Sequence, residues 1–154
     1  MENKEISNNR DFEIGQAGEF IVCADLISKG YNAFQAGSGL SYDVVVDIKG
    51  KLYRIQVKTC RKPALVSKKQ NKSPGYIFHV RRMGKGLRKR YSKTDLDIFA
   101  FVALDKKQVA YMLNDKDTPI TVVMRLEETQ FTNKFSKFFW DYTWEKCLEG
   151  IKND

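Results

Sequence analysis

The chain has 154 residues, of which 42% are hydrophobic and 30% charged, and this balance predicts one globular domain spanning 1–154. No apolar run approaches the ~18 residues of a membrane span, and the first residues lack a signal peptide, so a cytoplasmic protein without disulfides is expected. The net charge is +8, and three scattered cysteines with one histidine, His79, argue against a structural zinc site or a histidine-based catalytic set.

The first predicted element is a helix over residues 12–29, ended by Gly30. Glu19 lies in this helix among apolar positions, where a buried carboxylate is costly unless it has a partner or a purpose. Two apolar stripes at helical spacing predict burial on nearly all sides of the helix. They are Ala17, Phe20, Ile21, Ala24 and Ile27, and Val22, Cys23 and Leu26.

A strand at 31–35 and a flexible loop at 36–41 are expected next. They precede a hairpin, with strands at 42–48 and 52–60 joined by a tight turn in which Gly50 takes a positive φ. Further strands are expected at 76–82, 97–104, 109–114 and 120–126, followed by a moderately helical, aromatic-rich tail at 127–149.

The nearly continuous apolar run of 97–104 predicts an interior strand. The predicted elements together indicate an α/β fold.

Polar side chains on the hairpin are expected to gather at one end of the sheet. Because strand side chains alternate between faces, Gln56 and Lys58 share one face of the second arm. The short turn makes the arms antiparallel, which brings Asp43 beside them. If the helix also brings Glu19 over this end, two carboxylates, an amide and an ammonium converge there.

This combination of groups suits phosphodiester hydrolysis. The carboxylates of Glu19 and Asp43, with the Gln56 carbonyl as a weaker neutral ligand, are oxygen ligands of the kind that Mg²⁺ prefers, with Mn²⁺ as a substitute. Such an ion stabilises charge on a phosphate and lowers the pKa of a bound water. Lys58 would position or help to deprotonate the attacking water and offset phosphate charge.

The segments "GQAGEFIVCADL" and "SYDVVVDIKGKLYRIQVKT" resemble the core of the PD-(D/E)xK nuclease superfamily. Within it, the chain is most similar to small homing endonucleases encoded by group I introns of cyanobacteria and phages, which use a Gln-x-Lys variant. The resemblance implies a restriction-endonuclease-like core, a mixed β-sheet flanked by helices. It also implies that Glu19 is the helix acid, Asp43 the principal metal ligand, Gln56 the replacement for the usual acid and Lys58 the catalytic lysine.

The chain departs from the superfamily pattern at two positions. Tyr42 stands where proline is common, and Gln56 is not an acid, which leaves one fewer negative charge for the metal. Asp47 is not expected to reach the site, and Asp95 and Asp97 are interpreted as loop or strand-capping residues.

The resemblance implies a Mg²⁺-dependent, sequence-specific double-strand DNA endonuclease in a bacterial or phage-infected cytoplasm. It also implies a homodimer or homotetramer, because one 17.8 kDa subunit spans too little of a long target. One alternative keeps the fold and changes the activity to a Holliday-junction resolvase, a mismatch-nicking nuclease or a restriction-type nuclease. Another is a basic nucleic-acid-binding module without catalysis.

The positive charge is concentrated in residues 61–93, which hold twelve Lys and Arg and no Asp or Glu. Such asymmetry indicates a polyanionic partner, here double-stranded DNA. Some of these basic residues, on 76–82 or on a ribbon through 62–78, are expected to enter the major groove and read bases, with arginine to guanine as the favoured pairing. The residues expected to contact DNA are Lys62, Lys68, Lys69, Arg81, Arg82, Lys85, Arg88, Lys89 and Arg90.

Aromatic residues are concentrated in 131–144, where core packing and a subunit interface are both open interpretations.

Overall fold

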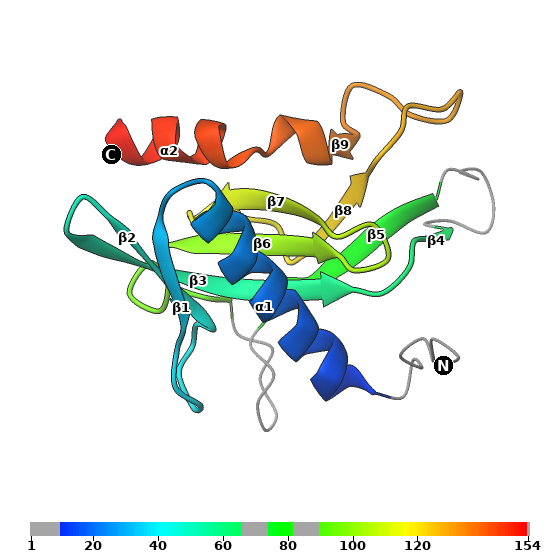
Figure 1. Ribbon diagram of the computed structural model, residues 1–154. Helices are drawn as coiled ribbons and strands as arrows, with labels where there is room; N and C mark the ends of the chain where they lie inside the picture. Colours follow the sequence, from blue (N-terminus) through cyan, green and yellow to red (C-terminus); the bar gives the residue numbers. More distant parts are fainter. Residues whose placement is uncertain (1–9, 66–73, 82–89, 154) are drawn as a thin grey trace.

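The computed structural model describes residues 10–65, 74–81 and 90–153 (Figure 1). No helix in these ranges combines the length and the hydropathy of a membrane span. The elements in chain order are α1 (Asp11–Ser28), β1 (Asn32–Gln35), β2 (Val44–Ile48), β3 (Lys51–Cys60), β4 (Ala64–Leu65), β5 (Pro74–His79), β6 (Ile98–Ala103), β7 (Gln108–Leu113), β8 (Thr121–Arg125), β9 (Lys137–Phe138), the 3-10 helix η1 (Phe139–Asp141) and α2 (Trp144–Lys152).

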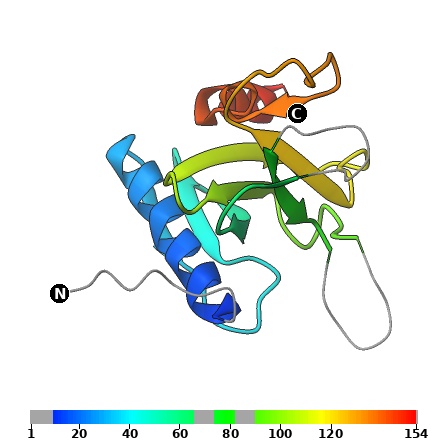
Figure 2. The ribbon, with the colours of Figure 1, turned by 90° about the vertical axis from the view of Figure 1, so that its right-hand side faces the viewer.

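The strands form two sheets. The first has the order β1-β2-β3-β6-β7, with β3 and β6 parallel and the other neighbours antiparallel. The second has the order β4-β5-β8-β9. Figure 2 shows α1 and the strands β5 and β8 on opposite sides of the first sheet. The prediction of a mixed sheet flanked by helices is confirmed.

Strand β6 is buried on both faces, because each face of the first sheet is covered by a different layer. All of its residues are buried. Ile98 belongs to the core cluster that includes Val22 and Leu26 of α1, whereas Phe99 belongs to the cluster that includes Phe78 of β5. This double burial explains the continuous apolar run in the sequence and confirms the predicted interior strand.

The predicted first helix is confirmed, but its predicted burial on nearly all sides is wrong. The buried positions of α1 recur every fourth residue, at Ile14, Gly18, Val22 and Leu26. Phe20 and other members of the predicted apolar stripe face solvent, and Phe20 is 56% exposed. The physical reason is that α1 packs against only one sheet face, so a single stripe can be covered.

Helix α1 approaches β3 very closely at Gly18. A Cβ atom added there would lie 1.8 Å from Oγ1 of Thr59, well inside van der Waals contact. Only glycine permits this approach without displacing the helix or the strand. The contact brings Glu19, the next residue of the helix, down to the edge of the sheet.

The predicted helical tail is wrong for its first part. Residues 127–136 form turns, in which Thr132 Oγ1 donates to the carbonyl of Thr129 and the amide of Asn133 donates to Ser136 Oγ. Such local hydrogen bonds compete with helix formation. Within 127–149 the chain is helical in the short 3-10 helix η1 and in α2, where Thr143 Oγ1 accepts from the amide of Lys146 and caps the first turn.

The tail aromatics divide between the core and the surface. Phe138, Phe139 and Trp144 are buried, whereas Phe135 and Trp140 are exposed. Core packing therefore accounts for part of this cluster.

Candidate active site

Asp43 lies immediately before β2 and is fixed by the neighbouring strand β3. Its amide donates to the carbonyl of Ile55 at 2.8 Å, and its Oδ2 accepts from the amide of Val57 at 2.8 Å. The Nε2 of Gln56 donates to the same oxygen. Both side-chain hydrogen bonds end on Oδ2, so Oδ1 is the oxygen of Asp43 suited to a cation. The predicted meeting of Asp43 and Gln56 is confirmed.

Lys58 follows on the same face of β3 and is half-buried. Burial lowers the pKa of its ammonium, while the negative charge of Asp43 acts in the opposite direction. The Nζ atom lies 3.5 Å from the hydroxyl of Tyr91 and 5.5 Å from the centroid of its ring. Lys58 is therefore influenced by the charge of Asp43 and contacts an aromatic ring from a distant part of the chain.

Glu19 reaches the site from α1. Its Oε2 accepts a hydrogen bond of 2.9 Å from Nε2 of Gln35, at the end of β1. Burial raises the pKa of Glu19, and the charge of Asp43 raises it further. The pKa of Asp43 is also raised by burial, against opposing effects from Val57 and Lys58. Two carboxylates are thus held near each other with their charged forms disfavoured.

These carboxylates line an open groove of about 460 Å³. One wall is the first half of α1, from Asp11 to Glu19, and the other is Gln35 with the loop 36–40 and Asp43. The groove gives solvent and ligands access to both acids.

The oxygen donors here fit a hard divalent cation. The described part of the chain contains no group of three or more His, Cys, Asp or Glu side chains arranged around a metal position. The donors here are instead Glu19, Asp43 and the amide oxygen of Gln56. Burial is the first cause of the raised pKa of Glu19 and the charge of Asp43 the second, and a cation between the two acids would offset both.

Sequence reasoning missed Gln35 and Tyr91. Gln35 pairs with Val44, so pairing the predicted strand 31–35 with 42–48 would have placed it beside Asp43. Tyr91 had no comparable signal, because its position beside Lys58 depends on the parallel pairing of β3 with β6.

The other acids have structural partners, as predicted. The carboxylate of Asp97 accepts from the amide of Arg54 at 2.8 Å and from its guanidinium at 3.0 Å. Asp47 accepts from the amide of Gly50 at 2.7 Å, and Asp95 from the amide of Ser92 at 2.8 Å.

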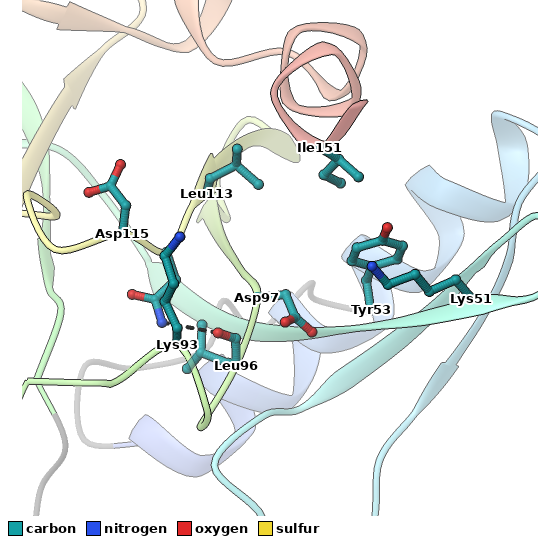
Figure 3. A pocket seen from close by; sticks show the side chains of 9 residues that line it. Lys51, Tyr53, Lys93, Leu96, Asp97, Leu113, Asp115 and Ile151 are labelled. Atoms are coloured by element: carbon teal, nitrogen blue, oxygen red, sulfur yellow. Dashed lines mark hydrogen bonds between the residues drawn. The ribbon is translucent and has the colours of Figure 1, made fainter. Parts of the chain in front are cut away.

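Asp97 also borders a separate pocket of about 360 Å³, together with Lys51, Tyr53 and Ile151 (Figure 3). None of the four predicted site residues lines this pocket, so it is distinct from the acidic groove.

Three of the predicted DNA contacts fall on described residues. Lys62 follows β3 and is exposed, Arg81 follows β5 and is half-buried, and Arg90 is exposed. His79, at the end of β5, is an exposed strand residue, as expected. The remaining predicted contacts, Lys68, Lys69, Arg82, Lys85, Lys89 and Arg88, lie outside the described residues. DNA contact by any of these nine residues stays a prediction.

A mixed sheet flanked by helices, with acids, an amide and a lysine on adjoining elements, is the architecture of the restriction-endonuclease-like nucleases. The chain belongs to the PD-(D/E)XK endonuclease family, whose model matches residues 10–146. Its fold is similar to that of a bacterial homing endonuclease, I-Ssp6803I, with a TM-score of 0.71 and 19% identity over 94% of this chain and 95% of that chain. No curated protein matches the chain. The predicted family and fold are confirmed, and the chain is an endonuclease.

Proposed function

We propose that the chain is a Mg²⁺-dependent, sequence-specific double-strand DNA endonuclease of the homing type, with its active site at Glu19, Asp43, Gln56 and Lys58. The observation that carries the proposal is the contact of the first hairpin arm with the second. Asp43 accepts hydrogen bonds from Gln56 and Val57, and Lys58 follows on the same face. The likeness to a bacterial homing endonuclease supports the homing activity.

Mg²⁺, or Mn²⁺ in its place, would be held by the carboxylates of Glu19 and Asp43 and by the carbonyl oxygen of Gln56. When bound, the ion would stabilise charge on the scissile phosphate and acidify a water molecule. The amide NH₂ of Gln56 orients the carboxylate of Asp43 by donating to its Oδ2. A glutamate at this position could not donate that hydrogen bond.

Lys58 supplies the remaining chemistry from the protein. Its ammonium can donate hydrogen bonds to a phosphate oxygen and to the attacking water, which offsets charge that develops in the transition state. Because burial lowers its pKa, the amine also exchanges its proton more readily than an exposed lysine does.

DNA contacts are proposed for the basic residues of 61–93 that the sequence singles out. Among the described residues of this region, Lys62 and Arg90 are exposed and Arg81 is half-buried, so Lys62 and Arg90 are accessible to a polyanion. If about six phosphates are neutralised, the logarithm of the DNA affinity should fall with that of the salt concentration with a slope near −5. A flat salt response would remove this segment from the DNA-binding surface.

We also propose that the enzyme is a homo-oligomer. The exposed positions of α1 from 12 to 28 carry no charge and are mostly apolar, although such positions are usually charged or polar. Phe12 is 78%, Phe20 56% and Ile27 55% exposed. An uncharged apolar face lets two chains of net charge +8 approach without repulsion between charged side chains at the contact.

Light scattering tests this assembly. It should give a dimer or tetramer for the wild type and a smaller species for Phe20→Glu. A strict monomer with and without DNA would contradict the proposal.

The proposed activity is tested with a randomised plasmid library in Mg²⁺, followed by sequencing of the cut ends. The wild type should cut both strands at one recurring sequence. Lys58→Ala should abolish cleavage while retaining DNA binding, and Lys51→Ala, an exposed lysine on the same strand, should behave as wild type.

Three outcomes would reject parts of the proposal, the first from this cleavage experiment and the other two from DNA-binding assays with the same protein. Full activity of Lys58→Ala rejects the site. Four-way junctions bound far better than linear duplex would favour a resolvase. Binding that is indifferent to Mg²⁺, without cleavage, would favour a non-catalytic module.

A further inference from the structure

Tyr91 is a side chain at the site that the mechanism above does not use. It is half-buried, and its hydroxyl lies 3.5 Å from Nζ of Lys58. Its ring centroid lies 5.5 Å from the same nitrogen, within the range of a cation–π contact. Tyr91 therefore meets the ammonium of Lys58 with both its polar and its aromatic parts.

The ring of Tyr91 is held by the sheet itself. It packs edge-on against Phe99, with ring centroids 5.6 Å apart. Phe99 is fully buried on β6, where it pairs with Gln56 of β3. The series of side-chain contacts thus starts at Phe99, on the strand adjacent to the site, and runs through Tyr91 to Lys58.

A lysine needs such support more than the other groups of the site do. Asp43 and Gln56 fix each other by a hydrogen bond, and Glu19 is fixed by Gln35. Lys58 has a long, flexible side chain, and ordering it has an entropic cost of roughly 1.5–2 kcal/mol. An adjoining ring and hydroxyl reduce the number of orientations that its ammonium can take.

We propose that Tyr91 is a positioning residue for Lys58, whose ring and hydroxyl hold the ammonium toward Asp43 and the scissile phosphate. This inference rests on the proposed function. Tyr91 would act through Lys58, the side chain that its hydroxyl and its ring both contact.

The first test is a pair of substitutions. Tyr91→Phe retains the ring and loses the hydroxyl, and it should lower the single-turnover cleavage rate of the recurring target sequence recovered from the library about twofold to fivefold. Tyr91→Leu loses both contacts and should lower the rate about 10-fold to 100-fold, as loss of a supporting partner commonly does. The affinity for duplex DNA and the thermal unfolding midpoint of Tyr91→Phe should stay at wild-type values.

A double-mutant cycle separates positioning from a general structural role. In a Lys58→Ala background, Tyr91→Leu should change the residual rate less than about twofold, because the group it positions is gone. An equal loss in both backgrounds would overturn the proposal. So would a wild-type rate for Tyr91→Leu in an active enzyme, which would leave the proposed function intact.

Chemical labelling gives a readout that does not require cleavage. An amine-reactive acylating reagent should label Lys58 several-fold faster in Tyr91→Leu than in the wild type, with Lys51 as the internal reference. Tyr91→Phe should stay near the wild-type rate because its ring still covers the amine. Unchanged labelling of Lys58 in Tyr91→Leu would overturn the positioning role. If the residual cleavage rate of Lys58→Ala is too small for the double-mutant cycle, this labelling experiment tests the positioning role by itself. A wild type that cuts nothing in the library would reject the proposed function and the positioning role together.

Discussion

Strand β3 carries two polar clusters on one face, and they differ in how their charges are balanced. Arg54 and Asp97 form a closed pair, with the carboxylate accepting from the amide and the guanidinium of Arg54. Lys58 lies four positions further along the strand, in a cluster that holds one ammonium and the two carboxylates of Asp43 and Glu19.

The pKa values of the charged groups in the two clusters are shifted in opposite senses, toward the charged form in one and away from it in the other. The hydrogen bonds to Asp97 raise the pKa of Arg54, so the charged form of the arginine is stabilised. In the second cluster the pKa of Glu19 and that of Asp43 are raised and that of Lys58 is lowered, so each charged form is disfavoured. A cluster of this kind retains affinity for an external ligand, whereas a closed pair stabilises the fold.

Substituting one acid of each cluster should give the largest effects, on cleavage for one cluster and on stability for the other. Asp43→Asn should lower cleavage at least about 10²–10³-fold while the free energy of unfolding changes little, because an asparagine oxygen can still accept from Val57. Asp97→Asn should do the reverse. It should lower the free energy of unfolding by about 1–2 kcal/mol and leave cleavage intact below the unfolding transition, because its half-exposed pair is structural.

Single-turnover cleavage and urea unfolding measure the two effects. Cleavage lost in Asp97→Asn and retained in Asp43→Asn would invert the assignment of the clusters.

Two glycines of α1 test whether the close approach of the helix to β3 positions Glu19 in the second cluster. Gly18→Ala should destabilise the protein by about 1–3 kcal/mol, since its methyl group would collide with Thr59, and the displaced helix should move Glu19 and lower cleavage about tenfold. Gly15→Ala is the matched control. A Cβ added at Gly15 meets nothing within 4 Å, so this substitution should stabilise the helix by about 0.5–1 kcal/mol. Equal effects at both positions would show that the close approach does not position Glu19.

The smallest expected effect concerns the cost of ionising Glu19 without metal, which comes first from burial and second from the charge of Asp43. The folded-state pKa of Glu19 is raised above its ordinary 4.5, so the stability linked to its protonation is present below that pH and is lost as pH rises through the raised pKa. Glu19→Gln removes this loss and keeps a side chain that can accept from Gln35. It should match the wild type near pH 4 and exceed it by a few tenths to about 1 kcal/mol near pH 7.

Urea unfolding in the presence of a chelator measures this difference. A difference between Glu19→Gln and wild type that is the same at both pH values would contradict the proposed cost of ionising Glu19.

The hairpin part of the site was predictable from local rules. Alternation of side chains and a two-arm turn are enough to bring Asp43 beside Gln56, and the register of β2 and β3 agrees. The interior position of β6 was predictable for a similar reason, since only burial on both faces supports a continuous apolar run.

Contacts between distant segments were not predictable from those rules. The exposed face of α1 carries Phe20 and Ile27, so apolar periodicity indicated a second buried stripe, which the single covering sheet does not provide. The position of Glu19 depends on the glycine contact with Thr59, and that of Tyr91 on the parallel pairing of β3 with β6. These are tertiary facts that residue spacing does not contain.

Binding of Mn²⁺ to the metal-free protein, measured by titration calorimetry, tests the central claim most directly. The unbalanced cluster should bind the ion in the wild type and in Asp97→Asn with similar affinity, and Asp43→Asn should weaken binding at least about tenfold. Wild-type affinity in Asp43→Asn would contradict the assignment of this cluster as the metal-dependent centre of the nuclease.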